Sequence, residues 1–368
     1  MKVLMLSIDE KVFEKGSPAS VRMIDYGSLV EELHIIVYTR SRRTRTLLAQ
    51  NVTLYPTNTR FKIMYFWTAF GLCKRFLLRD PHMLVTSQDA LTSLVALALK
   101  RRFPWMKFEV QAHTDITSPY FVRESMKNRL RYSAYRFSLR RASCIRAVSQ
   151  RVKDGIVSRF KISAEKISVL PIFVDVKTVA ETPSQTDMRV AYPEFSAKIL
   201  MVSRLTREKN IPLALSAFRE VLSKLKDVGL IFVGDGPEAQ KLRALAERMG
   251  IEQNVRWEGW QGNTSPYYKT ADLFLITSNY EGYGVVIIEA LAAGLRVVST
   301  DVGVASEVGA MISSRSPAAI AEKIIKALLG RERGLLRNYP YTSYTDYLNR
   351  YRAGWEGCGA NISLGEML

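Results

Sequence analysis

Short apolar runs alternate with longer amphipathic segments along the first half of the chain. Segments 90–101 and 125–141 have the length and composition of helices. Alternation of short strands and longer helices is typical of βα units on a parallel sheet. The runs that we predict to be strands are 2–8, 34–39, 51–55, 82–87, 107–112, 144–149 and 167–171.

A second alternation of the same kind begins near residue 198. Between the two series, segment 181–193 is polar, holds two prolines and lacks apolar periodicity, which predicts a linker or an irregular surface loop. We predict an α/β protein with two doubly wound domains, 1–180 and 181–343, and ligands at the carboxyl ends of the strands. The second series has predicted strands at 199–203, 229–233, 254–258, 273–277 and 296–299, and helices at 212–226, 237–249, 285–293, 317–329 and 344–355.

The composition is that of a globular protein with two cores. The chain has 368 residues, 47% hydrophobic and 24% charged, which excludes disordered and collagen-like chains. Cys73, Cys144 and Cys358 form no CxxC pair and are odd in number, so the pattern supports neither a disulfide framework nor a thiolate zinc site. We therefore expect a reducing, cytoplasmic environment. The start of the chain indicates a strand rather than a signal peptide, and the apolar run 63–73 is too short to span a bilayer.

Positive charge is concentrated in the first half. The chain has 53 Lys and Arg against 35 Asp and Glu, a net charge of +18. Residues 1–190 hold 32 basic and 16 acidic side chains, hence +16, which leaves +2 for residues 191–368. Such a basic half should attract a polyanion: nucleic acid, an anionic membrane face or phosphorylated substrates.

Several common catalytic motifs are missing from the sequence. There is no GxxxxGK[ST] phosphate loop, no HExxH, no GxSxG and no DxD, so phosphate-loop NTPase, zincin and α/β-hydrolase chemistry lose support. The run Gly234-Asp235-Gly236 follows a strand and precedes a helix, but its third dinucleotide-binding glycine is absent. We interpret it as a tight turn.

The second domain holds a more specific set of residues. Arg204 and Lys209 follow its first strand, where two cations could hold a diphosphate. Glu281 and Glu289 lie eight residues apart around a glycine-rich helix start, whose free N–H groups favour an anion. Cations, a helix N-terminus and two acids together indicate a nucleotide-sugar site.

The residues around this set resemble a known family. Segments ILMVSRLTREKN, LIFVGDGPEAQKL, NVRWEGW and SNYEGYGVVIIEALAAGLRVVSTDVG, with their E-x7-E pair, are similar to the donor-binding half of family 4 glycosyltransferases, which are retaining and have the GT-B fold. Weaker similarity covers AVSQRVKDGIVSRF and KISVLPIFVD. The segment YTSYTDYLNRYRAGWE resembles the family's last helix, so residues 344–357 should pack back on the first domain. This resemblance implies two Rossmann-like domains with an interdomain cleft.

The resemblance also implies roles for individual residues. Arg204 and Lys209 would compensate the charge of the diphosphate without a metal. Glu281 would orient the donor sugar, and Glu289 would bind the ribose hydroxyls. Backbone contacts to sugar and phosphate would come from the start of the helix, at Tyr283, Gly284 and Val285.

Two residues of the first domain complete the implied site. Gly16 lies in the loop after the first strand and would approach the phosphates. His113 follows a strand, as does a family histidine near the transferred sugar, so the implied catalytic set is Glu281, His113, Arg204 and Lys209. A lone histidine at a strand end is also often only a packed, hydrogen-bonded side chain. We assign no role to His34 or His82.

The sequence departs from the family pattern at three places. Gly303-Val304 stands where the family commonly has two glycines, the stretch GAMISSRSP after Glu307 is shortened, and Ile172-Phe173-Val174 replaces an asparagine-glycine pair before Asp175. These departures leave the donor sugar and the nucleotide base open.

Aromatic and basic residues alternate in two segments of the basic half. Residues 60–67 and 74–79 would suit a helix lying on a membrane. A second cluster holds nine cations between Arg123 and Arg151 against one acid, Glu124, and each cation near an anionic leaflet contributes about 1 kcal/mol. The alternative is that the aromatic residues pack into the core of the first domain and the arginines solvate its surface.

Together, these observations lead to a functional hypothesis. We expect a metal-independent, retaining glycosyltransferase of the hexosyltransferase type (EC 2.4), without a cofactor, peripheral on the inner face of the cell membrane. It would transfer a sugar from a UDP- or GDP-sugar to a lipid-linked glycan acceptor. The alternatives are a glycosyltransferase with a soluble acceptor and a basic nucleic-acid-binding protein; for the latter the sequence offers no recognised motif.

Overall fold

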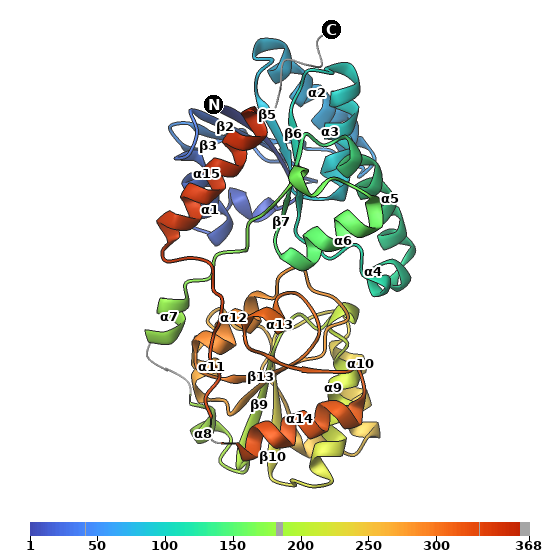
Figure 1. The fold of residues 1–368 in the computed structure, drawn as a ribbon, viewed down its shortest axis with the longest axis vertical. Coiled ribbons are helices and arrows are strands. Elements are labelled where there is room, and N and C mark those ends of the chain that lie inside the picture. The colour runs from blue at the N-terminus through green and yellow to red at the C-terminus, as the bar shows by residue number, and fades with distance from the viewer. Residues whose placement is uncertain (41, 182–186, 331, 361–368) are drawn as a thin grey trace. The chain divides into compact units, whose positions relative to one another are not determined.

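The computed structural model describes residues 1–40, 42–181, 187–330 and 332–360 (Figure 1). The chain divides into two compact units. Among the described residues, unit 1 comprises 1–117, 125–171 and 341–360, and unit 2 comprises 118–124 and 172–340. The chain thus enters unit 2 at 172, not at the expected 181, because helix α7 (Val176–Glu181) packs against α12 (Val285–Ala292) of that unit.

Unit 1 is built on an eight-stranded sheet in the order β3-β4-β2-β1-β5-β6-β7-β8. Only β3 runs antiparallel, to β4; the other pairs are parallel. Strand β3 was not predicted, because its four residues are only partly buried and give no clear alternation. The other seven strands confirm the sequence prediction, with bounds β1 Lys2–Ser7, β2 Glu32–Val37, β3 Thr46–Ala49, β4 Val52–Pro56, β5 Leu84–Ser87, β6 Phe108–Ala112, β7 Cys144–Ala147 and β8 Ile167–Val169.

Helices of unit 1 begin at recognisable capping residues. Ser17, Ser125 and Ser149 each accept a hydrogen bond from a backbone N–H of the first turn, and Asp89 forms a capping box with Thr92. Helices α2, α3 and α5 form one packed group, in which α3 contacts both others. The bounds are η1 Glu10–Phe13, α1 Pro18–Gly27, α2 Met64–Arg79, α3 Ala90–Arg102, α5 Met126–Arg141, α6 Gln150–Phe160, η2 Ala164–Lys166 and α15 Tyr344–Ala360.

Helix α15, at the red end of the colour scale, packs on unit 1 beside α1 (Figure 1). The Tyr351 ring stacks on Tyr26 of α1 with centroids 4.1 Å apart. A disulfide between Cys144 of β7 and Cys358 of α15 also fastens the helix to the sheet, while Cys73 is free and buried. The interpretation that the cysteines form no disulfide was wrong: the partners are 214 residues apart in sequence and meet only in the folded unit.

Unit 2 has a six-stranded, all-parallel sheet in the order β11-β10-β9-β12-β13-β14. Helices α9 and α14 cover one part of it, and Phe218, Phe232 and Leu273 are fully buried in its core. The strands are β9 Ala197–Val202, β10 Val228–Val233, β11 Val255–Trp257, β12 Leu273–Ile276, β13 Arg296–Thr300 and β14 Met311–Ser313. The further helices are η3 Arg207–Lys209, α9 Ile211–Leu222, α10 Ala239–Arg248, η4 Glu252–Asn254, α11 Ser265–Thr270, α13 Ala305–Val308 and α14 Pro317–Leu329.

Two short segments of unit 2 differ from the prediction. The expected linker 181–193 contains the short helix α8 (Met188–Ala191), with Met188 buried; residues 182–186 of that linker lie outside the described residues. Helix α4 (Pro119–Glu124), which lies within the predicted first domain, belongs to unit 2 because the Phe121 ring packs edge-on against Tyr280. Across the described ranges, no helix is both long enough and apolar enough to cross a membrane.

Candidate functional site

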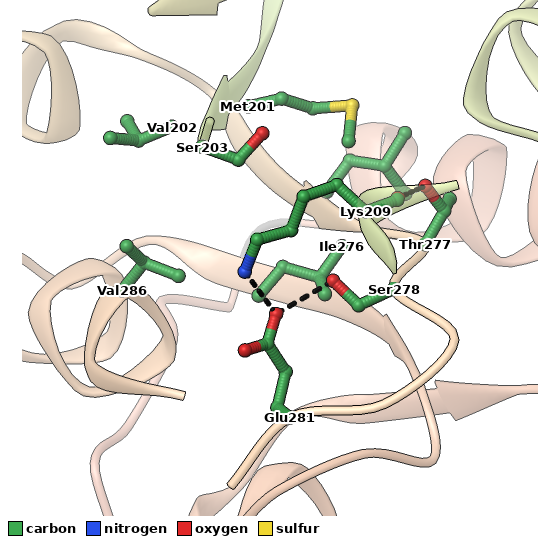
Figure 2. A pocket seen from close by; sticks show the side chains of 10 residues that line it. Met201, Val202, Ser203, Lys209, Ile276, Thr277, Ser278, Glu281 and Val286 are labelled. Atoms are coloured by element: carbon green, nitrogen blue, oxygen red, sulfur yellow. Dashed lines mark hydrogen bonds and ion pairs between the residues drawn. The ribbon is translucent and has the colours of Figure 1, made fainter. Parts of the chain in front are cut away.

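A pocket lies in unit 2 where strands β9 and β12 end (Figure 2). It is narrow, with a cavity volume of about 10 Å³, and it is partly open to solvent. The carboxyl end of a parallel sheet is where α/β proteins place ligands, since helix N-termini and loops converge there. Polar lining residues are Ser203, Lys209, Thr277, Ser278 and Glu281.

An ion pair between Lys209 and Glu281 forms one wall of this pocket. The Lys209 Nζ lies 2.6 Å from Glu281 Oε1, and both side chains are mostly buried. Figure 2 shows that Ser278 points to the same carboxylate, with its hydroxyl donating to Oε1 at 2.7 Å. The Glu281 carboxylate is therefore held by two donors and has a fixed orientation.

The backbone around Lys209 explains how this cation reaches the pocket. Asn210 adopts a left-handed conformation with φ 47° and thereby ends η3. The Thr277 hydroxyl at the end of β12 donates to the Lys209 and Asn210 carbonyls at 3.1 Å. Asn210 also donates its side-chain amide to Asn279. The loop after β9 is thus fastened to the end of β12, which places Lys209 beside Glu281.

Helix α12 begins next to the same pocket. Gly284 precedes it with φ 96°, a conformation that glycine adopts without strain, and no side chain caps the helix. The first N–H groups of α12, starting at Val285, therefore lack a side-chain acceptor and are suited to an anion. Tyr283 is buried, and its carbonyl accepts from the Val304 N–H at 2.9 Å.

Gly303 is the member of the usual glycine pair that this geometry requires. It has φ 53°, and a Cβ there would collide with the Tyr283 carbonyl oxygen. Val304, at the position of the second glycine, is buried without any such conflict and bonds Tyr283 through its backbone. The departure from the family pattern is therefore compatible with the loop before α12.

Glu289 lies one turn into α12 and is held by an aromatic hydroxyl. The Tyr268 hydroxyl of α11 donates to Glu289 Oε2 at 2.8 Å. Burial raises the pKa of Glu289 above its ordinary value, and the bond from Tyr268 offsets part of this rise. The carboxylate keeps acceptor capacity for further hydroxyl donors.

Arg204 is placed differently from Lys209. Its side chain is 75% exposed and pairs with Glu208 at 3.0 Å. It follows β9 as predicted but does not line the pocket. Exposed ion pairs of this kind contribute little to stability, so the Arg204 side chain can reorient at small cost.

Gly16 and His113 belong to unit 1. Gly16 has φ 79° and lies between η1 and α1, with open space where a Cβ would be. His113 directly follows β6, and its Nε2 lies 3.0 Å from the Gln111 side-chain oxygen. Desolvation, together with the positive charges of Arg146 and Arg22, lowers the pKa of His113 to about 3. The His113 side chain is exposed, and the lowered pKa leaves its imidazole neutral at pH 7.

The structure reveals two supporting residues that the sequence did not single out. Ser278 bonds Glu281, and Tyr268 bonds Glu289. Ser278 could have been noticed, because it follows β12 and lies three residues before Glu281. Tyr268 is 21 residues from its partner, and no pattern connects the two.

Comparisons with known proteins agree with this architecture. A family model described as "Glycosyl transferases group 1" matches residues 187–340, and one described as "Glycosyltransferase Family 4" matches residues 29–178. Solved structures with a similar fold include the lipopolysaccharide outer core galactosyltransferase WaaB, with TM-score 0.66, 18% identity and coverage of 97% of this chain and 99% of that one. Anabaena HepE in complex with UDP-glucose has TM-score 0.68 and 20% identity, with 89% and 90% covered. The fold is therefore GT-B.

Curated relatives match shorter stretches. An uncharacterized glycosyltransferase of Methanocaldococcus jannaschii is 28% identical over 60% of this chain and 56% of its own length. The alpha-monoglucosyldiacylglycerol synthase of Streptococcus pneumoniae is 30% identical over 41% and 36%. The lipopolysaccharide 1,6-galactosyltransferase of Salmonella typhimurium is 31% identical over 42% of each. The chain thus spans about half, or less, of the length of these relatives. With its two units matched by complementary models, the chain belongs to the family 4, group 1 glycosyltransferases.

Proposed function

We propose that this protein is a retaining glycosyltransferase that transfers a sugar from a UDP- or GDP-sugar to a membrane-associated, lipid-linked acceptor. The observation that carries the proposal is the Lys209–Glu281 ion pair beside the uncapped start of α12. This arrangement supplies a cation, a fixed carboxylate and free N–H groups in one pocket. The cation and the N–H groups can bind a diphosphate, and the carboxylate can accept hydrogen bonds from a sugar.

In the proposed reaction, the acceptor hydroxyl attacks the anomeric carbon on the face from which the nucleoside diphosphate departs. The bond between the anomeric carbon and the phosphate oxygen breaks, the new glycosidic bond forms, and the acceptor proton passes to the departing diphosphate. Lys209, a reoriented Arg204 and the N-terminus of α12 stabilise the negative charge that develops on the leaving group. These groups can do so without a metal, and neither a cofactor nor a protein nucleophile is required.

The remaining predicted residues have supporting roles in this proposal. Glu289 accepts hydrogen bonds from the ribose, and Glu281 orients the sugar ring. Gly16 lets the backbone approach the phosphates, and His113 contacts the transferred sugar. HepE, which has been solved with UDP and with UDP-glucose, supports a uridine nucleotide as the first donor to test.

Exposed apolar residues on helix α5 support attachment to a membrane. Met126, Leu130 and Phe137 are more than half exposed, at 68%, 67% and 54%, and their spacing places them within about 40° of one another around the helix. Exposed cations lie beside this stripe, so the exposed face of α5 combines apolar and basic side chains; the cations are Lys127, Arg129, Arg136, Arg140 and Arg141.

Helix α2 combines this pattern with core packing. One face of the helix is buried in unit 1, at Ala69, Cys73 and Leu77. This face agrees with the alternative interpretation, in which the segment packs into the core of the first domain. Trp67 and Leu78 are 68% and 61% exposed. Aromatic and aliphatic side chains with nearby cations suit the headgroup region of an anionic leaflet. These observations support our proposal that the protein attaches to a membrane that holds the acceptor, and we propose the cytoplasmic face as its location.

A donor screen tests the proposed activity. The protein is incubated with UDP-, GDP- and ADP-sugars, with and without a membrane lipid extract, and release of nucleoside diphosphate is followed. We expect release that requires the extract and is lost in Glu281→Ala. Release with no extract but with soluble glycans would favour the soluble-acceptor alternative. No release with any donor and no nucleotide binding by calorimetry would contradict the proposal.

Liposome flotation tests the membrane surface separately. We expect binding to anionic vesicles at physiological salt, and about tenfold weaker binding when Leu130 and Phe137 are changed to serine, since each loses apolar burial. Val190→Ser is the matched control, because this residue is 77% exposed but lies in unit 2. Equal binding by all three proteins, or none by the wild type, would refute the surface.

The alternative function of a different class is that of a basic nucleic-acid-binding protein. Its supporting observation is only the +16 charge of residues 1–190, and such a charge binds nucleic acid without specificity. A duplex or single strand that binds at physiological salt and displaces vesicles would favour it.

A further inference from the structure

A buried polar network lies under the end of strand β6, in the core of unit 1. Glu109 and Arg146 are 2% and 5% exposed, and their side chains lie 3.5 Å apart. Burying two charges costs free energy that a well-packed apolar pair would not. The stability of the sheet therefore does not explain why this pair is charged. The hydrogen bonds around the pair indicate that it orients neighbouring side chains.

The direction of each hydrogen bond can be followed from Glu109. An ionised carboxylate only accepts, so the Thr86 hydroxyl, 2.6 Å from Glu109 Oε2, donates its single hydrogen to it. Thr86 must then accept from the Gln111 amide nitrogen, which lies 2.7 Å from its oxygen. The same nitrogen also lies 3.3 Å from Glu109 Oε2. Both contacts fix the orientation of the Gln111 amide.

The fixed amide determines the state of His113. With its nitrogen turned to Thr86 and Glu109, Gln111 presents its oxygen to the histidine, 3.0 Å from Nε2. An amide oxygen accepts, so Nε2 must carry the hydrogen. His113 is neutral at pH 7, because desolvation and the charges of Arg146 and Arg22 lower its pKa below the ordinary 6.5. A neutral imidazole with its hydrogen on Nε2 has a lone pair on Nδ1.

We propose that the Glu109–Thr86–Gln111 relay fixes His113 as the Nε2–H tautomer, so that Nδ1 meets the substrate as a hydrogen-bond acceptor. Gln111 is a positioning residue, and Glu109 acts through it. The placement of His113 at the transferred sugar rests on the proposed function; the tautomer does not. It follows that the group facing His113 must be a hydroxyl or N–H donor. A carboxylate or a deoxy position there would lose this hydrogen bond.

Helix α15 supports the relay from the other side. The Trp355 indole donates to Glu109 Oε2 at 3.2 Å, and the Arg146 guanidinium donates to the Tyr351 hydroxyl at 2.6 Å. These contacts give each member of the buried pair a further hydrogen-bond partner. The last helix of the chain therefore stabilises the group that orients His113.

Nitrogen NMR of the wild-type protein tests the tautomer without any substrate. The chain has three histidines, so His113→Asn assigns the signals. We expect a single neutral tautomer at pH 7 with an Nε2 proton in slow exchange with water. An Nδ1–H tautomer, or an Nε2 proton that exchanges freely, would overturn the proposal.

Two variants separate positioning from general structural damage. Gln111→Met keeps the side-chain length but removes the acceptor, so we expect mixed tautomers and a rapidly exchanging Nε2 proton. Tyr26→Phe, the matched control, removes a buried hydrogen bond to Tyr347 that the relay does not use, and it should leave the tautomer unchanged. If Gln111→Met keeps the wild-type spectrum, or if the control also mixes the tautomers, Gln111 is not the positioning residue.

Kinetics of the same variants connect the relay to the proposed function. Once the donor is known, Gln111→Met should lower kcat/KM about tenfold while the Kd of the nucleoside diphosphate, which binds in unit 2, stays constant. If the NMR result holds and no transfer is found with any donor, the proposed function fails and the relay stands. A wild-type kcat/KM in Gln111→Met would refute the link between the relay and the sugar.

Discussion

The two units hold their polar residues together in different ways. In unit 2, Lys209 and Glu281 come from one continuous stretch of sequence, at the ends of neighbouring strands of a parallel sheet. In unit 1, the network around Glu109 joins β5, β6 and β7 to α15, and its Trp355 lies 246 residues further along the chain. The pocket of unit 2 is partly open, whereas the network of unit 1 is buried. We therefore expect substitutions in the partly open pocket to change activity more than stability. Substitutions in the buried network should lower the stability of the whole of unit 1.

Breaking the buried pair should have the largest effect on stability. Arg146→Met leaves the Glu109 carboxylate buried without its cation, so we expect a loss of about 3–5 kcal/mol in the free energy of unfolding, measured by denaturant titration. The double variant Glu109→Met with Arg146→Met should recover most of it, because no unpaired charge remains. UDP binding in unit 2 should persist below the transition. An unchanged unfolding midpoint in Arg146→Met would show that the pair is not needed.

Changing the cation of the unit 2 pocket should affect activity more than stability. Lys209→Met removes the charge that would stabilise the leaving diphosphate, so we expect a loss of about 10²–10³ in kcat. The loss of stability should be smaller than in Arg146→Met, because the Glu281 carboxylate is partly exposed and keeps its hydrogen bond from Ser278. Lys241→Met is the control, since Lys241 is 70% exposed and pairs only across its own helix start with Glu238. Equal activity of both variants would exclude Lys209 from the reaction.

The disulfide tests how strongly α15 is fastened to unit 1. In unfolded protein without reductant, only Cys73 should react with a thiol reagent, and all three cysteines should react after reduction. Cys358→Ser should lower the free energy of unfolding by about 2–4 kcal/mol, since the bridge constrains the unfolded chain. Cys73→Ala is the control for the free thiol. Three reactive thiols before reduction would show that the pair stays reduced.

The smallest effect concerns pH and Glu289. Burial raises its pKa above the ordinary 4.5, so its own contribution to folding is fully present below the unfolded pKa and is lost as the pH rises through the folded pKa. Ribose binding needs the ionised form, so UDP affinity should fall as the pH drops through the same raised pKa. Calorimetry across this range should show a decrease of up to about tenfold that is absent in Glu289→Gln. A pH-independent affinity in the wild type would argue against a contact between Glu289 and the ribose.

Much of the fold could be predicted from local pattern. Buried parallel strands are continuous apolar runs, so 2–8 and 273–277 were found within one or two residues of β1 and β12. Helix α3 was found from the length and composition of its segment, at 90–101 against Ala90–Arg102. Strand β3 and helix α8 were missed, because elements of four residues give too few positions for a period.

The sequence by itself determined the two α/β units and singled out Lys209, Glu281 and Glu289 as candidates, because strands, helices and motifs each depend on short stretches of chain. Tertiary structure decided which polar groups meet. It paired Cys144 with Cys358, gave Glu289 its partner Tyr268, and turned Gln111 toward His113. Hydrogen bonds and disulfides form between groups that are close in space, and closeness between distant segments arises only when the sheet and its helices have packed.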